Sequence, residues 1–342
     1  MKKYNVAVIG VGVVGIEMLR VLKQRKFPIN TLRIFARSAR EIEVDGEKFK
    51  VEAVSPEGFE GIDIALFAGT EGEKGAAVTY AAEAVKRGAV VIDNGADFRM
   101  DPTVPLVVPE VNAKDVLKHK GIIANPNCST IQMVVALWPI YKKAGIKRII
   151  VTTLQASSGA GRGAVEQLRE ELTEIISSGC QNVHASKSQN RVMPQQLAYN
   201  VFPHIGGFAE SNYTSEEWKL VKETHKIMHD NKIKISATTV RVPVRTGHSE
   251  SVYIETKKPI TADAVCRLLA KAPGVVVMDD PQSNLYPMPK DAEGKDETFV
   301  GRVRQDYFLK NGLWLWVVAD NLRKGAATNA VQIAECVISG SR

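Results

Sequence analysis

The amino-terminal stretch of the chain constrains the fold more than any other. The residues VAVIGVGVVGIEML place Gly10, Gly12 and Gly15 between an apolar strand pattern and an amphipathic helix pattern, in the spacing G-x-G-x-x-G. In this motif the glycines permit a tight turn, close approach of the backbone to a pyrophosphate, and close packing of helix on strand. An ordinary tight turn is the simpler interpretation, but the position between a strand and a helix favours a dinucleotide site. Val13 and Val14, within the motif, belong to the same predicted site.

The end of the second predicted strand indicates which dinucleotide would bind. An acidic residue there would hydrogen-bond a ribose 2′-hydroxyl, whereas the stretch IFARSAR offers Arg37, Ser38 and Arg40. These groups suit a 2′-phosphate, so we expect NADP, held by Arg37 and Ser38. The alternative is that the arginines only face water, and Arg40 fits that description better than Arg37.

The order of the predicted elements indicates an α/β chain with two domains, the number that 342 residues favour. Short apolar runs (NVAVIG, TLRIFA, DIALFAG, AVVIDNG, GIIAN) alternate with helical patterns, as in a parallel Rossmann-type sheet. After Ala144 the strands lengthen, as in KRIIVTTLQ and LWLWVVAD, which predicts an α+β domain with a mainly antiparallel sheet and helices on one face. We expect a dinucleotide-binding domain over residues 1–127, completed by 322–342, and a second domain over 128–321. The last helix, about 325–339, should return to the first domain.

Composition and charge exclude several classes of protein. The net charge is +7, but lysines and arginines alternate with acids and form no basic run, so we expect no nucleic-acid partner. No apolar stretch approaches the roughly 20 residues of a membrane helix, and the start MKKYNVAVIG has no signal-peptide region, so we expect no membrane partner and a cytoplasmic location. The four cysteines lie far apart, so neither a metal site nor a disulfide framework is expected.

One cysteine occupies an unusual position. In ANPNCSTIQMVVAL, Pro126 ends a strand, Asn127 is a good N-cap, and Cys128 starts an amphipathic helix. A helix N-terminus lowers the pKa of a thiol, and its free N–H groups can hold an oxyanion. A buried apolar role is the alternative, and it is the one expected for the remaining cysteines, Cys180, Cys266 and Cys336. A reactive thiol beside a nicotinamide indicates chemistry in which an aldehyde and a thioester interconvert.

Five further stretches give the chain a specific resemblance. The motifs NPNCSTIQ, LQASSGAG, RVPVRTGHSESV, NLYPMP and WVVADNLRKGAA resemble those of the aspartate-β-semialdehyde dehydrogenase family, in order over nearly the whole chain. The resemblance implies reversible NADP-dependent reductive dephosphorylation of L-aspartyl-4-phosphate to L-aspartate 4-semialdehyde, in lysine, threonine and methionine biosynthesis. It also implies a homodimer or homotetramer, with catalysis and dimerisation in the second domain. The glycine loop GVGVVG is shorter than the common family form, so the choice between strict NADP use and dual use with NAD stays open.

The resemblance also assigns roles to individual residues. Cys128 would be the acylated nucleophile, His248 the acid/base, and Gln155 a substrate contact beside the thioester. Arg241 would hold the substrate α-carboxylate through two parallel hydrogen bonds, and Glu216 would meet the amino group.

Phosphate and cofactor residues are assigned in the same way. Phosphate would lie among Arg99, Asn127 and Lys219, and Ser158, Gly159 and Asn321 would complete the cofactor site near the nicotinamide. The stretch TSEEWKLVK independently predicts a helix with a capping box from Thr214 to Glu217, which puts Glu216 and Lys219 on one face.

Two other functions stay open from the sequence. N-acetyl-γ-glutamyl-phosphate reductase shares the fold, the cysteine and the acyl-phosphate chemistry, but the stretch RVPVRTGHSE favours the aspartyl enzyme. A non-catalytic dinucleotide-binding paralogue is the second alternative. The complete set of Cys128, Gln155, Arg241 and His248 argues against it.

Overall fold

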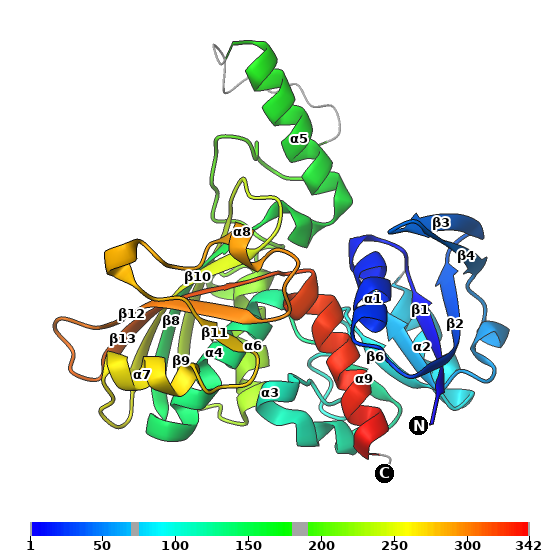
Figure 1. Cartoon of the computed structure of the whole chain (residues 1–342), viewed down its shortest axis with the longest axis horizontal. Coiled ribbons are helices and arrows are strands. Elements are labelled where there is room, and N and C mark those ends of the chain that lie inside the picture. The colour runs from blue at the N-terminus through cyan, green and yellow to red at the C-terminus, as the bar shows by residue number, and fades with distance from the viewer. Residues whose placement is uncertain (1, 70–74, 180–190, 341–342) are drawn as a thin grey trace. The chain divides into compact units, whose positions relative to one another are not determined.

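The computed structural model describes residues 2–69, 75–179 and 191–340 and divides into two compact units (Figure 1). The first unit comprises residues 1–127, 226–228 and 325–342, and the second comprises residues 128–225 and 229–324. Residues 70–74 and 180–190, which include Cys180, lie outside the described residues. Within the described part, no helix is both long and apolar enough to cross a membrane.

The first unit contains a seven-stranded sheet in the order β3-β4-β2-β1-β5-β6-β7. Its strands are β1 (Tyr4–Ile9), β2 (Ile29–Ala36), β3 (Arg40–Val44), β4 (Glu47–Ala53), β5 (Ile64–Phe67), β6 (Val90–Asp93) and β7 (Ile122–Ala124). Every neighbouring pair is parallel except β3 and β4. The helices of this unit are α1 (Val13–Gln24), α2 (Ala76–Lys86), α3 (Pro109–Asn112) and α9 (Thr328–Gly340). The predicted parallel Rossmann-type sheet is therefore confirmed.

Side chains that alternate along β1 divide the core of the first unit into two layers. Val6 and Val8 pack with α1 and α9, for example with Met18 and Val331. Ala7 and Ile9 instead belong to the layer that contains α2. The carboxyl-terminal helix is thus part of the first unit, as the sequence predicts.

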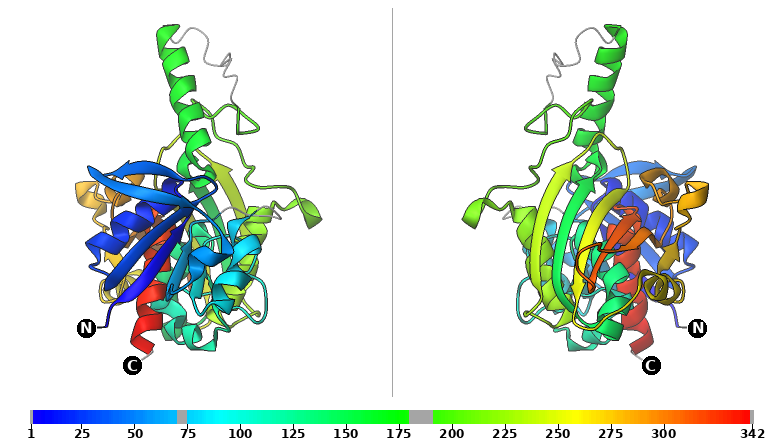
Figure 2. Two further views of the ribbon diagram at one scale, coloured as in Figure 1. Left: turned by 90° about the vertical axis from the view of Figure 1, so that its right-hand side faces the viewer. Right: turned by 90° about the vertical axis from the view of Figure 1, so that its left-hand side faces the viewer.

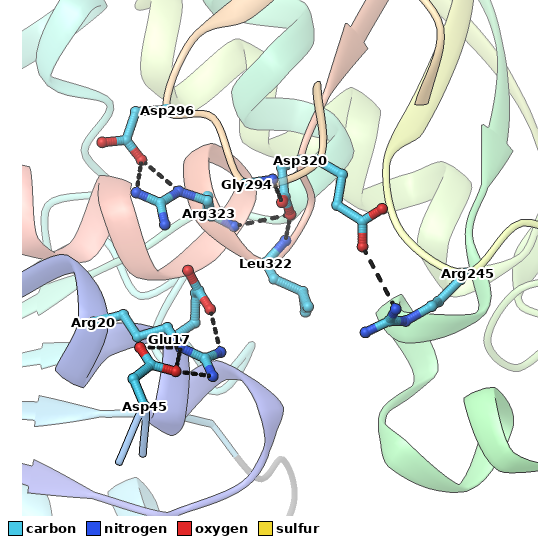
Figure 3. Close-up of polar contacts among 10 residues, drawn as sticks. Glu17, Arg20, Asp45, Arg245, Gly294, Asp296, Asp320, Leu322 and Arg323 are labelled. Atoms are coloured by element: carbon cyan, nitrogen blue, oxygen red, sulfur yellow. Dashed lines mark hydrogen bonds and ion pairs between the residues drawn. The ribbon is translucent and has the colours of Figure 1, made fainter. Parts of the chain in front are cut away.

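The apolar runs in the sequence do not predict the hairpin formed by β3 and β4. Its turn contains Asp45 and Gly46, both with positive φ, 51° and 80°. An Asp-Gly pair between two strand patterns is a strong hairpin signal, because both turn residues must take up this conformation. Arg20 on α1 forms an ion pair with Asp45 at 2.9 Å, which connects the turn to the helix (Figure 3).

The second unit contains a six-stranded sheet in the order β11-β12-β13-β10-β8-β9. Its strands are β8 (Ile146–Gln155), β9 (Lys234–Arg241), β10 (His248–Thr256), β11 (Val275–Val277), β12 (Thr298–Gln305) and β13 (Gly312–Ala319). Three of the five neighbouring pairs are antiparallel, which confirms a mainly antiparallel sheet. Figure 2, right, looks onto its curved strands.

The helices of the second unit are α4 (Cys128–Ala144), α5 (Arg162–Ser177), α6 (Ser215–Met228, of which residues 226–228 are assigned to the first unit), α7 (Ala262–Leu269) and α8 (Pro289–Ala292). Helices α4 and α7 pack against the sheet, α4 on β10 and β13 and α7 on β12. Helix α5 extends away from the sheet (Figures 1 and 2). The contact of α4 with β10 matters most for the site, because α4 starts at Cys128 and β10 starts at His248.

Candidate active site

Strand register in the second unit brings three predicted site residues together. Gln155 ends β8 and pairs directly with Arg241, which ends the parallel strand β9. Strand β10 runs antiparallel to β8, and its Ser249 pairs with Leu154, so His248 lies beside Gln155. The three side chains therefore lie side by side where β8 and β9 end and β10 begins, although they are far apart in the sequence.

Cys128 is the first residue of the 17-residue helix α4 and is partly buried. The first N–H groups of a helix have no partner within the helix, so this position offers hydrogen-bond donors to an anion. Burial lowers the pKa of Arg241, and a negative charge on Cys128 would oppose that shift, so the two groups lie within one electrostatic site.

His248 is completely buried and is oriented by the main chain. Its Nδ1 accepts the N–H of Ala156 at 3.0 Å. Burial, followed by the charge of Arg241, holds the pKa of His248 well below its ordinary value, so the imidazole is neutral. Since Nδ1 accepts a hydrogen bond, the single proton of the neutral ring is on Nε2. Nε2 itself has no hydrogen-bond partner among the described residues, and it lies against Gly159, whose added Cβ would be 3.1 Å away.

Arg241 binds the same main-chain position as His248. Its Nη1 donates to the carbonyl of Ala156 at 2.6 Å, whereas its Nε has no partner within the described part of the chain. Burial lowers the pKa of Arg241, and the charges of Glu216 and Cys128 oppose that shift. The guanidinium is therefore a buried cation with an unused donor, which suits recognition of a carboxylate.

Gln155 and Glu216 complete the cluster around α4. The Nε2 atom of Gln155 donates to Ser129 Oγ at 2.8 Å and to Glu216 Oε1 at 3.3 Å. Glu216 also forms an ion pair with Lys219 at 3.4 Å. Both lie on α6, where the capping box predicted at its start is confirmed.

Asn321 is held firmly beside Ser158. It accepts the N–H of Gly247 at 2.9 Å, and its Nδ2 donates to Ser158 Oγ at 3.0 Å. The preceding residue, Asp320, accepts backbone N–H groups of Gly294 and Leu322, both at 2.8 Å (Figure 3). This network fixes the turn after β13, so Asn321 and Ser158 present preformed polar groups.

The glycine motif of the first unit has the geometry that a dinucleotide site needs. Gly10 has φ +103°, and a Cβ on Gly15 would lie 1.9 Å from the carbonyl of Gly10. A Cβ on Gly12 would meet nothing within 4 Å, so packing within the protein does not require glycine there. Gly12 is the N-cap of α1, which begins at Val13 and has no side-chain cap. The free N–H groups and the open approach at Gly12 fit a bound pyrophosphate.

The remaining predicted residues also have defined positions. Val14 lies in the first turn of α1 and packs against the core. Arg37 and Ser38 directly follow β2 and are exposed, and Arg40 donates to Ser38 Oγ at 3.3 Å. The exposed groups of Arg37 and Ser38 fit a 2′-phosphate.

Arg99 and Asn127, both buried, belong to the first unit. Arg99 donates to the carbonyls of Asn125 at 2.9 Å and Asn94 at 2.7 Å. Lys219 belongs to the second unit, so a shared role of these three residues in phosphate binding stays a prediction.

Two features of the site were missed from the sequence. The main chain of Ala156 orients both His248 and Arg241, a function that no side-chain pattern encodes. Ser129 accepts from Gln155, and only its place after the cysteine could have indicated this.

Comparison with known proteins agrees with both units. Residues 5–119 match the model of the family described as semialdehyde dehydrogenase, NAD binding domain. Residues 137–324 match the one described as semialdehyde dehydrogenase, dimerisation domain.

Relatives match over nearly the full length. The aspartate-semialdehyde dehydrogenase of Aquifex aeolicus is 53% identical, over 98% of both chains. The crystal structure of aspartate semialdehyde dehydrogenase II from Vibrio cholerae, complexed with ASA, has a TM-score of 0.92 at 42% identity, over 99% of both chains. The enzyme from Candida albicans, crystallised with NADP, has a TM-score of 0.72 at 25% identity, over 98% of both chains. The chain described here belongs to the aspartate-semialdehyde dehydrogenase family.

Proposed function

We propose that the chain catalyses the reversible, NADP-dependent conversion of L-aspartyl-4-phosphate to L-aspartate 4-semialdehyde and phosphate. The observation that carries the proposal is the cluster in the second unit, in which Cys128 at a helix start lies within electrostatic range of Arg241 and next to Ser129, which Gln155 contacts, close to Glu216 and His248. The same activity is named for the relative from Aquifex aeolicus, and ASA occupies the related structure from Vibrio cholerae.

The thiolate of Cys128 is the proposed nucleophile. It attacks the acyl carbon of the substrate, the bond from that carbon to the phosphate oxygen breaks, and phosphate leaves with the electron pair. A thioester on Cys128 remains. The helix N-terminus and the Arg241 cation both favour the thiolate over the thiol.

The residues of the glycine motif, together with Arg37 and Ser38, would hold NADP. When bound, NADPH supplies the hydride that reduces the thioester. In the chain itself, Gln155 and Ser129 border the place of the thioester, and the buried, water-poor surroundings of His248 protect it from hydrolysis.

His248 acts on the oxygen of the thioester carbonyl. Its Nε2–H donates a hydrogen bond there and stabilises the negative charge that develops on the oxygen. Complete transfer of this proton would leave an imidazolate, so the geometry favours hydrogen-bond donation over full proton transfer. The carbon–sulfur bond then breaks, and the aldehyde and the Cys128 thiolate separate.

Arg241 and Glu216 select the substrate. The unused Nε of Arg241 is available to the α-carboxylate, and the buried carboxylate of Glu216 is available to the α-ammonium group. An acetylated nitrogen carries no charge, so it would add no favourable charge interaction with Glu216, which already forms an ion pair with Lys219. This argument favours the aspartyl substrate over the N-acetylglutamyl one.

The cellular setting belongs to the same proposal. The reaction would serve lysine, threonine and methionine biosynthesis in the cytoplasm. We propose a homodimer, because more than half of the chain matches a dimerisation domain, and light scattering would distinguish it from a tetramer.

The test is a phosphate-dependent assay that follows NADP reduction. Purified enzyme is given aspartate semialdehyde or N-acetylglutamate semialdehyde, each with NADP and with NAD. The proposal expects turnover with the first aldehyde and NADP that depends on added phosphate. Preference for the acetylated aldehyde would support the reductase alternative, and cofactor binding without turnover would support the non-catalytic one.

The position of the covalent intermediate is tested separately. Quenching during turnover with aspartyl phosphate, followed by peptide mass spectrometry, should find the aspartyl mass on Cys128. Cys128→Ser should lose turnover while it keeps nucleotide affinity. An aspartyl adduct on another residue would contradict the mechanism.

A further inference from the structure

A buried acid lies close to the catalytic pair and has no role in the steps above. Glu250 follows His248 by two positions on β10, so the two side chains point to the same face of the strand. Glu250 is 0% exposed. Its strand neighbours are Thr153 on β8 and Val317 on β13. Neither neighbour has a group that ionises near neutral pH.

Among the described residues, no cationic side chain pairs with Glu250 to balance a negative charge. No ion pair within the described part of the chain includes it, and neither carboxyl oxygen has an aligned hydrogen-bond partner there. Burial raises the pKa of Glu250 well above its ordinary value, and a contact with the Gln132 amide opposes this shift only in part. A lone buried carboxylate is costly, so burial favours the neutral acid form of this side chain.

Gln132 links Glu250 to both catalytic residues. It lies on α4 four positions after Cys128, on the same face of the helix. Its Nε2 donates to the carbonyl of His248 at 3.4 Å, and its side chain contacts Glu250. Gln132 Oε1 has no donor among the described residues.

A proton on Glu250 resolves this contact. The contact with Gln132 lowers the pKa of Glu250, so the amide N–H of Gln132 faces the carboxyl, and Gln132 Oε1 is an acceptor that still has no donor among the described residues. The O–H of a neutral acid supplies that donor, and Gln132 Nε2 remains free to hold His248.

We propose that Glu250 is a positioning residue, which as a neutral acid hydrogen-bonds Gln132 and so holds the start of α4, with Cys128, against the start of β10, with His248. The inference rests on the proposed roles of Cys128 and His248. Glu250 touches neither substrate nor cofactor, and it acts only through Gln132.

Two substitutions of Glu250 separate the effect of its hydrogen bond to Gln132 from the effect of its side-chain volume. Glu250→Gln keeps the shape and offers an N–H donor without a charge, so we expect kcat within threefold of wild type and an unchanged pH profile. Glu250→Met keeps a similar volume but has no donor, and we expect kcat to fall 10- to 100-fold with little change in the KM for NADP. A matched control is Glu255→Met on the same strand, where the carboxylate forms a more exposed ion pair with Lys147. It should leave kcat unchanged.

A second readout does not depend on turnover. The rate at which iodoacetamide alkylates Cys128, followed by peptide mass spectrometry across pH, reports the surroundings of the thiol even if the proposed reaction is wrong. Glu250→Met should shift the pH of half-maximal alkylation, and Glu250→Gln should not. If Glu250→Met fails to fold, Gln132→Met removes the other partner and should give the same loss of kcat.

Three results would overturn the inference. Wild-type kcat and alkylation in Glu250→Met, or in Gln132→Met where the former does not fold, would show that the contact positions nothing. Loss of activity in Glu250→Gln equal to that in Glu250→Met would show that the amide cannot replace the acid. A shifted pH profile in Glu250→Gln would show that the carboxyl carries a charge.

Discussion

Replacing Gly159 with alanine would put a methyl group against the catalytic imidazole. The added Cβ would lie 3.0 Å from Cε1 and 3.1 Å from Nε2 of His248, and 3.4 Å from Nη1 of Arg241. Carbon atoms in contact prefer a separation of about 3.5 to 4.0 Å, so the methyl group is about 0.5 Å too close to the ring. Gly159 does not have a positive φ, so its backbone accepts alanine without strain.

The imidazole has little freedom to absorb this contact. His248 is completely buried, and the hydrogen bond from Ala156 fixes its Nδ1. Displacement of Nε2 by about 0.5 Å moves the donor away from the reacting oxygen. Since a 1 Å misplacement can cost about 100-fold in rate, we expect kcat to fall about tenfold, which corresponds to about 1.4 kcal/mol.

Initial rates of NADP reduction, measured with saturating aspartate semialdehyde and phosphate, test this prediction. Gly163→Ala is the matched control, because it adds the same methyl group to helix α5, where the nearest neighbour is the side chain of the exposed Val192, at 3.3 Å. Alanine is favoured over glycine within a helix by about 1 kcal/mol, so the control should keep its kcat and its melting temperature.

A separate result would refute the reasoning for Gly159. The resemblance assigns Gly159 to the cofactor site, so the methyl group could act on NADP and not on His248. An unchanged kcat with a raised KM for NADP would show that the contact with the imidazole is unimportant. A large fall in melting temperature would show that the variant disturbs folding.

Three further predictions follow from the same geometry. Gly12→Ala should raise the dissociation constant for NADP, measured by calorimetry, without lowering the melting temperature. Gly15→Ala should instead lower the melting temperature, because its Cβ would lie 1.9 Å from a backbone oxygen. Equal behaviour of the two variants would contradict the assigned roles of the two glycines. Arg241→Lys should raise the KM for aspartate semialdehyde at least tenfold, because lysine cannot form two parallel hydrogen bonds to a carboxylate, and an unchanged KM would exclude Arg241 from substrate binding. Burial lowers the pKa of His248 well below 6.5 and raises that of Glu250 well above 4.5, so between about pH 5 and 6 unfolding adds a proton to His248 and removes one from Glu250. Denaturant titration should therefore give a slope of unfolding free energy against pH that is higher than in wild type by about 1.4 kcal/mol per pH unit in Glu250→Gln. In His248→Asn the slope should be lower by the same amount. Slopes equal to wild type would contradict the argument that burial shifts the pKa of these two side chains.

Local patterns in the sequence predict much of this fold. The apolar runs of β1, β2, β5, β6 and β7 are short and bounded by turn residues, so each can be recognised without tertiary information. The β3–β4 hairpin was missed even though Asp45 and Gly46 mark its turn. Its strands carry many charged side chains, and an apolar pattern is a poor guide to such strands.

The candidate site could be predicted only in part. The position of Cys128 at the start of a helix can be recognised from the sequence, because it is local information. Gln155, Arg241 and His248 come from three different strands, and only the pairing register brings them together. Register depends on contacts across the whole sheet, so these residues could be named from the family resemblance but not from the physics of the sequence.

Main-chain atoms determine how the catalytic side chains are oriented. The N–H of Ala156 fixes the tautomer of His248, and its carbonyl anchors Arg241. One peptide segment thus sets both the hydrogen-bond donor for the reacting oxygen and the cation for the substrate carboxylate. Because any residue except proline would provide the same N–H and carbonyl, the side chain of the fully buried Ala156 matters only through packing. The path of the backbone after β8, set by the register of β8 with β9 and β10, is therefore what makes the chemistry possible.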